Sequence, residues 1–375
     1  MEPFKNFISP QLVRLLADHL ARHCAGVDAT RLSRSISRRL GPLELKERVQ
    51  LIADSLIKVM PADSAERAAI LLAMLRPEVA DGESQESDDQ GIAGWGVWPL
   101  TQIVGQYGAD DFDGSMALLR EMTKRSTSEF AIRYFLIQDQ ARALNIMTDW
   151  IDDSSHHVRR LISEGTRPRL PWAMQLPALR QNPGPVLPLL ERLRDDSSEY
   201  VRRSVANHLN DITKDNPELA LKLMKRWMRG APGPRKALLR HACRGLLKAG
   251  EPTAMRLFGF APPELKIDRI KLSAKRIAIG EKLDFSVRIH STSAKRQKLS
   301  IDYVVHHLRA NGSLSPKVFK GGLIDLPAGR SYLFSRSHSL RLVTTRRYYP
   351  GEQALSVRIN GVDTPSARFY LEESQ

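Results

Sequence analysis

The chain has 375 residues, enough for two or three domains, and its 42% hydrophobic and 26% charged residues are typical of a globular protein. Its net charge of +15 is uneven, because the last 111 residues carry 20 Lys and Arg against 9 Asp and Glu and so hold 11 of the surplus charges. No apolar run approaches the ~18 residues that span a bilayer, which excludes a membrane protein, and the basic C-terminal part is a natural place for a nucleic-acid contact.

The two cysteines lie far apart and belong to no metal-binding motif. Cys24 and Cys243 both fall in helical patterns, which suits a reducing cytoplasm. The N-terminus has no apolar core of the kind found in signal peptides. We therefore expect a cytoplasmic monomer that uses no metal or other cofactor and does not enter a membrane.

The first quarter of the chain predicts helices. Apolar residues recur at helical spacing from Pro10 to Leu75, in stripes such as Leu12, Leu16 and Leu20. Two tryptophans beside glycines follow, Trp95 and Trp98. They favour a helix start anchored in the core, with an exposed stacking platform as the alternative.

Helices then follow in quick succession. Proline-rich sequence interrupts them between residues 168 and 188. The predicted helices lie near 115–125, 128–137, 139–151, 155–164, 185–194, 198–212, 217–229 and 234–248.

A nine-residue motif occurs twice in this region. Residues 152–160 and 195–203 lie 43 positions apart and match at seven of nine positions. A period near 40 with helical flanks indicates an α-solenoid of HEAT-like repeats, in which each helix pair buries its apolar face against its neighbours. Ser154 and Ser197 are the expected helix caps.

Each copy of the motif ends in Val-Arg-Arg, which places two cations on one side of a helix. Arg159, Arg160, Arg202 and Arg203 can thus face a groove and bind a polyanion, of which nucleic acid is the most common. The alternative is that these arginines pack between repeats.

The pattern changes near Pro262 from helical spacing to alternation of period two. About seven short strands, separated by turns such as Asn311-Gly312, predict an immunoglobulin-like β-sandwich over 262–375, after a solenoid over 1–261. The strands are expected near 267–271, 283–289, 299–305, 318–320, 332–334, 355–359 and 368–370. Its basic turns contain the predicted DNA contacts Lys275, Arg276, Lys295, Arg296, Lys298, Arg346 and Arg347.

The residues that could carry chemistry are carboxylates. Glu129 begins a predicted helix, and Glu164 and Asp211 end the two helices of the repeated motif. A pair of carboxylates near an anomeric carbon can stabilise an oxocarbenium-like transition state and orient water. The two glutamates are also placed for ordinary surface ion pairs, Glu129 with Arg133 and Glu164 with Arg160.

Two runs resemble the signature of a known family. Residues 128–133 (SEFAIR) and 155–172 (SHHVRRLISEGTRPRLPW) resemble the AlkC family of bacterial DNA glycosylases, in the branch with a C-terminal immunoglobulin-like domain. The resemblance extends over the whole chain, and the family is similar to the AlkD glycosylases of HEAT-like repeats. It implies a monofunctional enzyme, acting at the bacterial nucleoid in base excision repair, that removes 3-methyladenine and 3-methylcytosine from double-stranded DNA without base flipping.

The family match also implies roles for individual residues. Glu129, Glu164, Asp211 and Trp172 form the expected catalytic set, and Arg133, Arg167 and Arg169 join the expected DNA contacts. An N3-methylated base is a cation with a weak glycosidic bond, so no general acid is needed. The Trp172 ring would favour the cation by about 0.5–2 kcal/mol. An open concave surface without a deep pocket fits cleavage without flipping.

Two other functions are compatible with the residues alone. A basic solenoid can be a non-enzymatic scaffold for nucleic acid, or an adaptor for an acidic protein.

Overall fold

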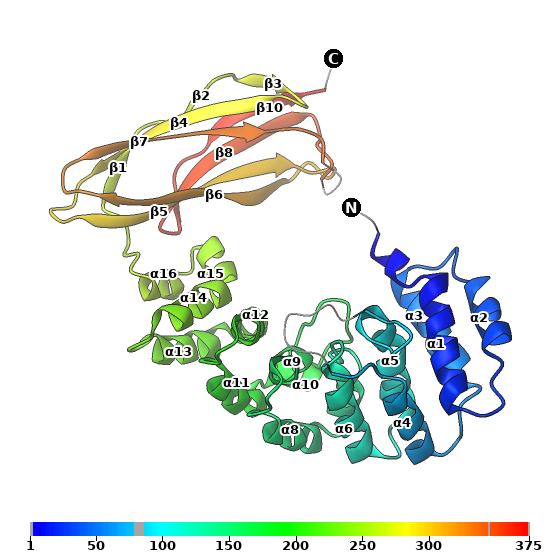
Figure 1. The fold of residues 1–375 in the computed structure, drawn as a ribbon. Helices are drawn as coiled ribbons and strands as arrows, with labels where there is room; N and C mark the ends of the chain where they lie inside the picture. Colours follow the sequence, from blue (N-terminus) through cyan, green and yellow to red (C-terminus); the bar gives the residue numbers. More distant parts are fainter. Residues whose placement is uncertain (1–2, 79–85, 344–345, 374–375) are drawn as a thin grey trace. The chain divides into compact units, whose positions relative to one another are not determined.

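The computed structural model describes residues 3–78, 86–343 and 346–373. Helices occupy the chain as far as Leu257 and strands begin at Leu265, so the predicted order of an all-α region followed by an all-β region is confirmed (Figure 1). Across the described parts of the chain, no helix is both long and apolar enough to cross a membrane.

Contacts between Cα atoms divide the chain into two compact units. The division lies earlier in the sequence than the predicted boundary at residue 261. One unit is Met1–Ala220 with Gly230–Ala242, and the other is Leu221–Arg229 with Cys243–Gln375. The last helices belong with the strands because they bond to them.

Three contacts in the second unit illustrate this. Arg358 Nη1 donates to the Lys248 carbonyl at 2.9 Å, and Asn360 Nδ2 donates to the Ala261 carbonyl at 2.8 Å. The backbones of Gly250 and Gly361 approach so closely that a Cβ on either would meet the other backbone at 2.5 Å.

The helices follow the predicted order with shifted ends. The long helix expected over 234–248 is two helices, which lie in different units, and a short helix inside the proline-rich segment was not predicted. The helices are η1 (Phe4–Phe7), α1 (Pro10–His23), α2 (Ala29–Ser37), α3 (Leu45–Ile57), α4 (Ser64–Ala73), η2 (Gly94–Gly96), α5 (Val97–Tyr107), α6 (Phe112–Thr123), α7 (Ile132–Gln138), α8 (Gln140–Asp149), α9 (His156–Gly165), α10 (Pro177–Gln181), η3 (Gly184–Val186), α11 (Leu187–Leu193), α12 (Glu199–Asp215), α13 (Pro217–Met228), α14 (Gly233–Ala242), α15 (Arg244–Ala249) and α16 (Pro252–Leu257).

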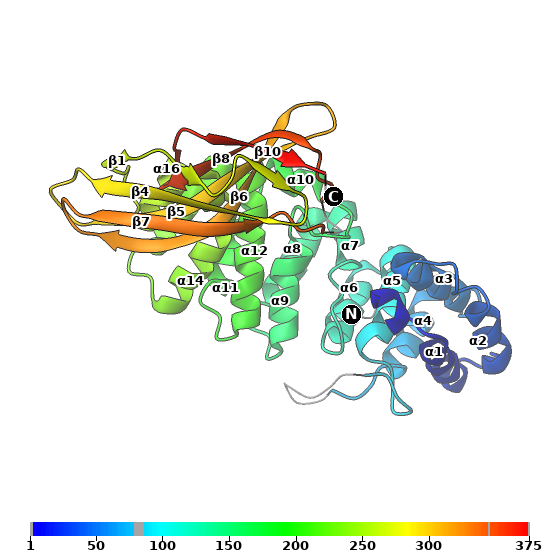
Figure 2. The same cartoon turned by 90° about the horizontal axis from the view of Figure 1, so that it is seen from above.

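Successive helices of the first unit pack on one another. Helix α9 contacts α6, α11 and α12, and α12 contacts α14; α9 and α12 lie side by side in both views (Figures 1 and 2). On α12 the buried apolar residues recur at helical spacing, at Val201, Val205, Leu209 and Ile212. This stripe is what fixes α12 against its neighbours.

The two copies of the repeated motif have equivalent structures. In each, the second aspartate accepts a hydrogen bond from the backbone N–H two residues on: Asp153 from Ser155 and Asp196 from Ser198, both at 2.8 Å. The helices begin after Ser155 and Ser198, whose side chains make no capping bond. The expectation that Ser154 and Ser197 cap these helices is therefore wrong, because the aspartates order the turn instead.

The first arginine of each pair reaches back to its own helix start. Arg159 Nη1 donates to the Asp153 carbonyl at 2.7 Å, and Arg202 Nη1 donates to the Ser197 carbonyl at 2.7 Å. Arg159 also forms two bonds, of 2.7 and 3.0 Å, to the Asp196 carboxylate of the next copy. The contacts of Arg159 match the alternative of packing between repeats, whereas these contacts of Arg202 lie within its own copy of the motif.

The second unit contains a sandwich of two sheets (Figures 1 and 2). In one, β4 pairs with β1, β2 and β7; in the other the order is β3-β10-β8-β5-β6, with β9 beside β8. Buried residues from both, among them Phe285, Phe334, Tyr303 and Phe369, form one core. The strands are β1 (Leu265–Ile267), β2 (Lys271–Leu272), β3 (Arg276–Ala278), β4 (Lys282–Ser291), β5 (Gln297–Leu308), β6 (Leu314–Leu326), β7 (Ser331–Ser339), β8 (Gly351–Ile359), β9 (Val362–Asp363) and β10 (Ala367–Glu372).

The bond between successive repeats gives a stability prediction. The Asp196 side chain is 6% exposed and pairs with Arg159, so Arg159→Met leaves a buried carboxylate without its cation. We expect the free energy of unfolding to fall by about 2–3 kcal/mol, as measured by urea denaturation. Arg203 is exposed, so the matched variant Arg203→Met should change it by less than about 0.5 kcal/mol. Equal losses in the two variants would contradict this account.

Candidate active site

A cavity of about 470 Å³ lies where four segments of the first unit meet, one of which is η2 with the start of α5. The segment before α7 supplies Glu129, the end of α9 supplies Glu164, and the loop after α9 supplies Trp172. The remaining lining residues are Gly94, Trp95, Trp98, Ser126, Thr127, Phe130, Arg167, Leu170 and Pro171. The sequence predicted an open surface without a deep pocket; the structure has a cavity there that is partly open to solvent and is lined by aromatic side chains far apart in the sequence.

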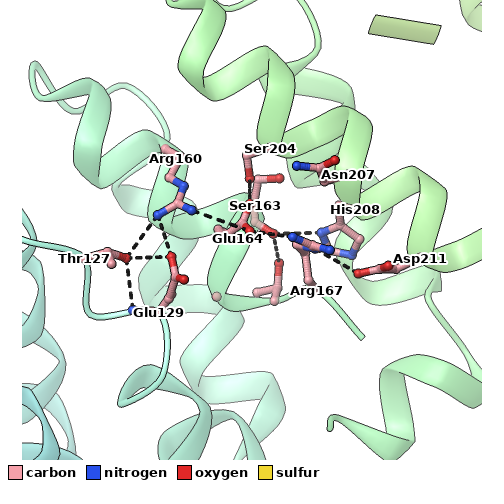
Figure 3. A network of polar contacts seen from close by, with 12 residues as sticks. Thr127, Glu129, Arg160, Ser163, Glu164, Arg167, Ser204, Asn207, His208 and Asp211 are labelled. Carbon is pink, nitrogen blue, oxygen red and sulfur yellow. Dashed lines mark hydrogen bonds and ion pairs between the residues drawn. The ribbon is translucent and has the colours of Figure 1, made fainter. Parts of the chain in front are cut away.

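Glu164 is the most constrained carboxylate of the site (Figure 3). Its side chain is 7% exposed. One oxygen accepts from Arg167 Nη1 at 2.6 Å and lies 3.5 Å from Arg160 Nη2. The other accepts from Ser204 Oγ at 2.6 Å.

This environment keeps Glu164 ionised. Burial raises the pKa of the Glu164 carboxyl, but Arg160 and Arg167, with the hydrogen bond from Ser204, outweigh that effect. The net pKa lies below its ordinary value, so Glu164 holds no proton to donate near neutral pH.

Glu129 shares a cation with Glu164. It lies in the turn before α7, rather than in the helix as predicted. Its Oε2 accepts from Arg160 Nη1 at 2.5 Å and from Thr127 Oγ1 at 2.9 Å. Arg160 therefore bridges the two carboxylates, and Glu129 does not form the predicted pair with Arg133.

Asp211 lies inside α12, which continues to Asp215, and it is buried. Its Oδ2 accepts from Arg167 Nε at 2.8 Å, and its Oδ1 accepts from Lys214 Nζ at 2.8 Å. Arg167 thus joins Glu164 on α9 to Asp211 on α12 (Figure 3). Asp211 is in the same network as the predicted catalytic carboxylates, but it does not line the cavity.

Arg133 does not lie where a DNA contact requires it. Its side chain is fully buried and donates to the carbonyls of Met174, Gly165 and Arg167 at 2.7 to 2.8 Å. Burial, together with the nearby Arg167, lowers the pKa of Arg133 to about 10. The prediction for this residue is corrected: it fixes the loop that carries Trp172.

Trp172 is held in an unusual backbone conformation, with a φ of 67°. That region is disfavoured for a bulky side chain and is found where a site imposes it. Its side chain is 58% exposed and meets the Phe4 ring edge-on, with 6.3 Å between ring centroids. The ring is therefore presented to solvent at the edge of the cavity.

The sequence prediction considered Trp95 and Trp98 as a core anchor or a stacking platform, but it missed Phe4, Phe7 and Phe130, which lie around them and Trp172. Phe7 stacks on Trp95 at 5.1 Å, and Trp98 packs on Phe130 at 5.0 Å. Phe4 and Phe7 are 49% and 45% exposed. The only sequence signal for them is that two aromatic residues occur close together near the N-terminus. Trp95 and Trp98 are partly buried, so neither a core anchor nor an exposed stacking platform describes them completely.

The remaining predicted DNA contacts differ in their interactions with other residues and in their exposure. Arg169 forms two bonds of 2.6 Å to Asp215. In the β-sandwich unit, Arg276 pairs with Glu372 and lies over the Tyr370 ring, and Arg346 donates to His307 at 2.7 Å. Arg347 is exposed and lies over the Tyr349 ring. Lys275, Lys295, Arg296 and Lys298 are exposed, Lys298 with its Nζ over the Phe260 ring.

The site as a whole offers fixed negative charge beside apolar ring faces. Burial lowers the pKa of His208, the histidine of the network, to about 4. That ring is therefore neutral at physiological pH and, like Glu164, is not a proton donor. Over the described residues, no three His, Cys, Asp or Glu side chains gather as metal ligands would. The arrangement can stabilise a cation and orient water, but it does not supply an acid.

Comparisons with known proteins cover the whole chain. A family model described as the C-terminal Ig-like domain of uncharacterised protein YhaZ matches residues 266–373, so the sandwich is Ig-like as predicted. The chain is 36% identical over 373 residues to the uncharacterized protein YhaZ of Bacillus subtilis (strain 168), covering 99% of this chain and 100% of that protein. It is also similar to the structure of Pseudomonas fluorescens alkylpurine DNA glycosylase AlkC bound to DNA containing an abasic site analog. The TM-score is 0.86, at 34% identity, with 99% of this chain and 100% of the other covered.

The lowered pKa of Glu164 gives a testable pH dependence of stability. A carboxyl whose pKa is depressed by folding stabilises the protein above its unfolded pKa, and the effect is lost as pH falls through the folded pKa. Glu164→Gln should therefore lower the free energy of unfolding by about 2–3 kcal/mol at pH 7. The difference from the unmodified protein should shrink below about pH 4.5, as measured by urea denaturation between pH 7 and pH 3. A difference that grows on acidification would contradict the assignment.

Proposed function

This chain belongs to the AlkC family of bacterial DNA glycosylases, and we propose that it hydrolyses the N-glycosidic bond of cationic alkylated bases in double-stranded DNA. The proposed substrates are 3-methyladenine and 3-methylcytosine, and the proposed enzyme is monofunctional and acts as a monomer in base excision repair. The observation that carries the proposal is the ionised Glu164, bridged through Arg160 to Glu129, beside the exposed Trp172 ring.

In this mechanism the leaving base departs as a neutral molecule because it starts as a cation. Positive charge then develops on the sugar, where Glu164 and Glu129 stabilise it and orient the attacking water. The Trp172 ring lies at the edge of the same cavity, where its π face attracts the cation. Arg160 and Arg167 hold the carboxylates in place, so little reorganisation is needed as charge develops.

The polar groups of the cavity support cleavage without base flipping. Thr127, Glu129, Glu164 and Arg167 bond to one another or to Arg160. They have little capacity left to read the edge of a base in the way that flipping enzymes do. We therefore propose that the damaged base stays in the duplex and that its charge, rather than its shape, is recognised.

We propose that DNA is held by exposed cations of both units, through phosphate contacts. Arg203 is the candidate among the paired arginines of the HEAT-like repeats. Lys275, Lys295, Arg296 and Arg347 are exposed on the Ig-like domain. The place of action is then the cytoplasm, at the nucleoid where the DNA lies.

The first activity prediction concerns Glu164, because Glu164→Gln keeps the shape of the side chain and removes its charge. We expect excision of 3-methyladenine to slow by about a hundredfold or more, with little change in DNA affinity. Glu129→Gln should act in the same direction but more mildly. The measurement is release of free base from methylated duplex DNA under single-turnover conditions at 25 °C. Glu218→Gln, an exposed glutamate on α13, is the matched control, and near-normal excision by Glu164→Gln would refute the assignment.

The second activity prediction concerns selectivity. A neutral lesion such as uracil or hypoxanthine leaves as an anion unless an acid protonates it, and neither Glu164 nor His208 holds such a proton. We expect release of 3-methylcytosine and no release of uracil from matched duplexes. Trp172→Ala should slow excision of the cationic lesion by about ten- to thirtyfold, the scale of a cation–π contact of about 1–2 kcal/mol. Comparable release of both lesions would mean that the chemistry uses a different acid.

The third prediction tests the Ig-like domain. Lys295→Ala combined with Arg296→Ala removes two exposed cations. If both contact phosphates, the slope of log affinity against log salt should become shallower by about 1.8, at about 0.9 for each contact. The measurement is fluorescence anisotropy with duplex DNA at several salt concentrations. Lys222→Ala with Lys225→Ala on α13, also exposed, is the control. An unchanged slope would show that this turn does not touch DNA.

A further inference from the structure

A second cavity, of about 320 Å³, lies beside the first one within the first unit. Trp98, Phe130 and Trp172 line both cavities. The second one also has three neutral polar residues, Gln50 from α3, Gln102 from α5 and Tyr134 from α7, and its remaining lining is Lys46, Glu47, Val49, Ala173 and Met174. Its volume falls within the range of small-ligand sites, and the proposed chemistry does not use it.

The polar wall has hydrogen-bonding capacity that the protein leaves unused. Gln102 Nε2 and Gln106 Nε2 lie 3.2 and 3.4 Å from the Tyr134 hydroxyl and donate to it. The hydroxyl oxygen is therefore occupied as an acceptor, and its own hydrogen is left to donate. Among the described residues no bond to Gln102 Oε1 is found, so an unused donor and an unused acceptor belong to two bonded residues that line the cavity.

The position of Tyr134 is fixed by the backbone of α5. A Cβ on Gly105 would lie 2.7 Å from Tyr134 Cδ2 and 3.2 Å from the Ala131 backbone. The absence of a side chain at Gly105 is what allows the ring to pack there. The hydroxyl is thus presented by a rigid support, as a binding site requires.

The two cavities differ in charge. The first has two carboxylates, Glu129 and Glu164, against one cation, Arg167, whereas the second has one carboxylate, the exposed Glu47 of α3, and its neutral polar lining consists of amides and a phenol. Lys46, an exposed cation of α3, also lines the second cavity. Aromatic rings stack on any base, an adjacent donor and acceptor match a base edge, and a lysine matches the attached phosphate.

We propose that the second cavity binds a neutral, undamaged nucleobase of the DNA substrate, unstacked from the duplex and held against Trp98, Phe130 and Trp172. The proposal rests on the proposed function, which supplies the DNA. The base can come from the strand opposite the lesion or from a neighbour of the damaged nucleotide. In either case it contacts the ring that separates the two cavities, so filling the second cavity also positions Trp172 for the first.

The test removes the base and measures binding. Duplexes that carry an abasic-site analogue in place of the lesion are compared with duplexes that also lack the opposite base or one neighbouring base. Loss of the base that occupies the cavity should weaken binding about tenfold or more in fluorescence anisotropy. Deleting the same base should weaken DNA binding by the Tyr134→Phe variant several-fold less, because this variant has already lost the contact between the hydroxyl and the base. The duplex that shows the effect identifies the source of the base.

The controls separate this proposal from the proposed function. Tyr107→Phe alters an exposed tyrosine that lines neither cavity and should behave like the unmodified protein. Glu164→Gln should lose excision but keep the dependence on the base, because no catalysis is needed for binding. Equal affinity for all duplexes in the unmodified protein would overturn the second site while leaving the glycosylase proposal intact. A base effect that survives unchanged in both Tyr134→Phe and Gln102→Leu would also overturn it.

Discussion

The structure of the active site depends on the buried guanidinium of Arg167 between Glu164 and Asp211. Each of these side chains is at most 9% exposed, so none could remain charged there alone at a tolerable cost in free energy. Because one carboxylate is on α9 and the other on α12, the cation joins two successive repeats. Arg167 also lies at the start of the loop that leads to Trp172, so the same interaction that joins the repeats determines where this loop starts.

Arg133 completes this arrangement from the opposite side of the loop. It donates to three carbonyls at 2.7 to 2.8 Å, in a segment whose prolines prevent regular backbone pairing. A backbone φ of 67° at a tryptophan is unfavourable by itself and persists only where the surroundings impose it. The packing of the repeats thus stabilises Trp172 in a backbone conformation that this residue would not adopt alone.

Features that depend on local sequence could be predicted, and those that depend on distant contacts could not. The 43-residue spacing of the Asp-Asp-Ser-Ser motif and the alternation of the strands are visible in the sequence itself, because repeats and sheets each impose a fixed period on it. Glu129 and Glu164 were identified through a local motif, and they do meet at one cavity. The pair of Arg160 with Glu129, the contact of buried Arg133 with the Arg167 carbonyl and the contact of Phe4 with Trp172 each join residues 30 or more positions apart. No local pattern marks such pairs, because their positions are set by helix packing.

The electrostatics of the network also explain why such an enzyme would be restricted to one class of lesion. A carboxyl that serves as an acid needs an environment that favours its protonated form, usually apolar burial without a nearby cation. Glu164 has the burial but is paired with Arg160 and Arg167, which reverse its effect on the pKa. Removing those arginines to create an acid would leave buried carboxylates uncompensated and would release the loop that carries Trp172. The interactions that build the site are therefore the same ones that keep Glu164 from acting as an acid, and the proposed selectivity for bases that already carry a positive charge would follow from these interactions.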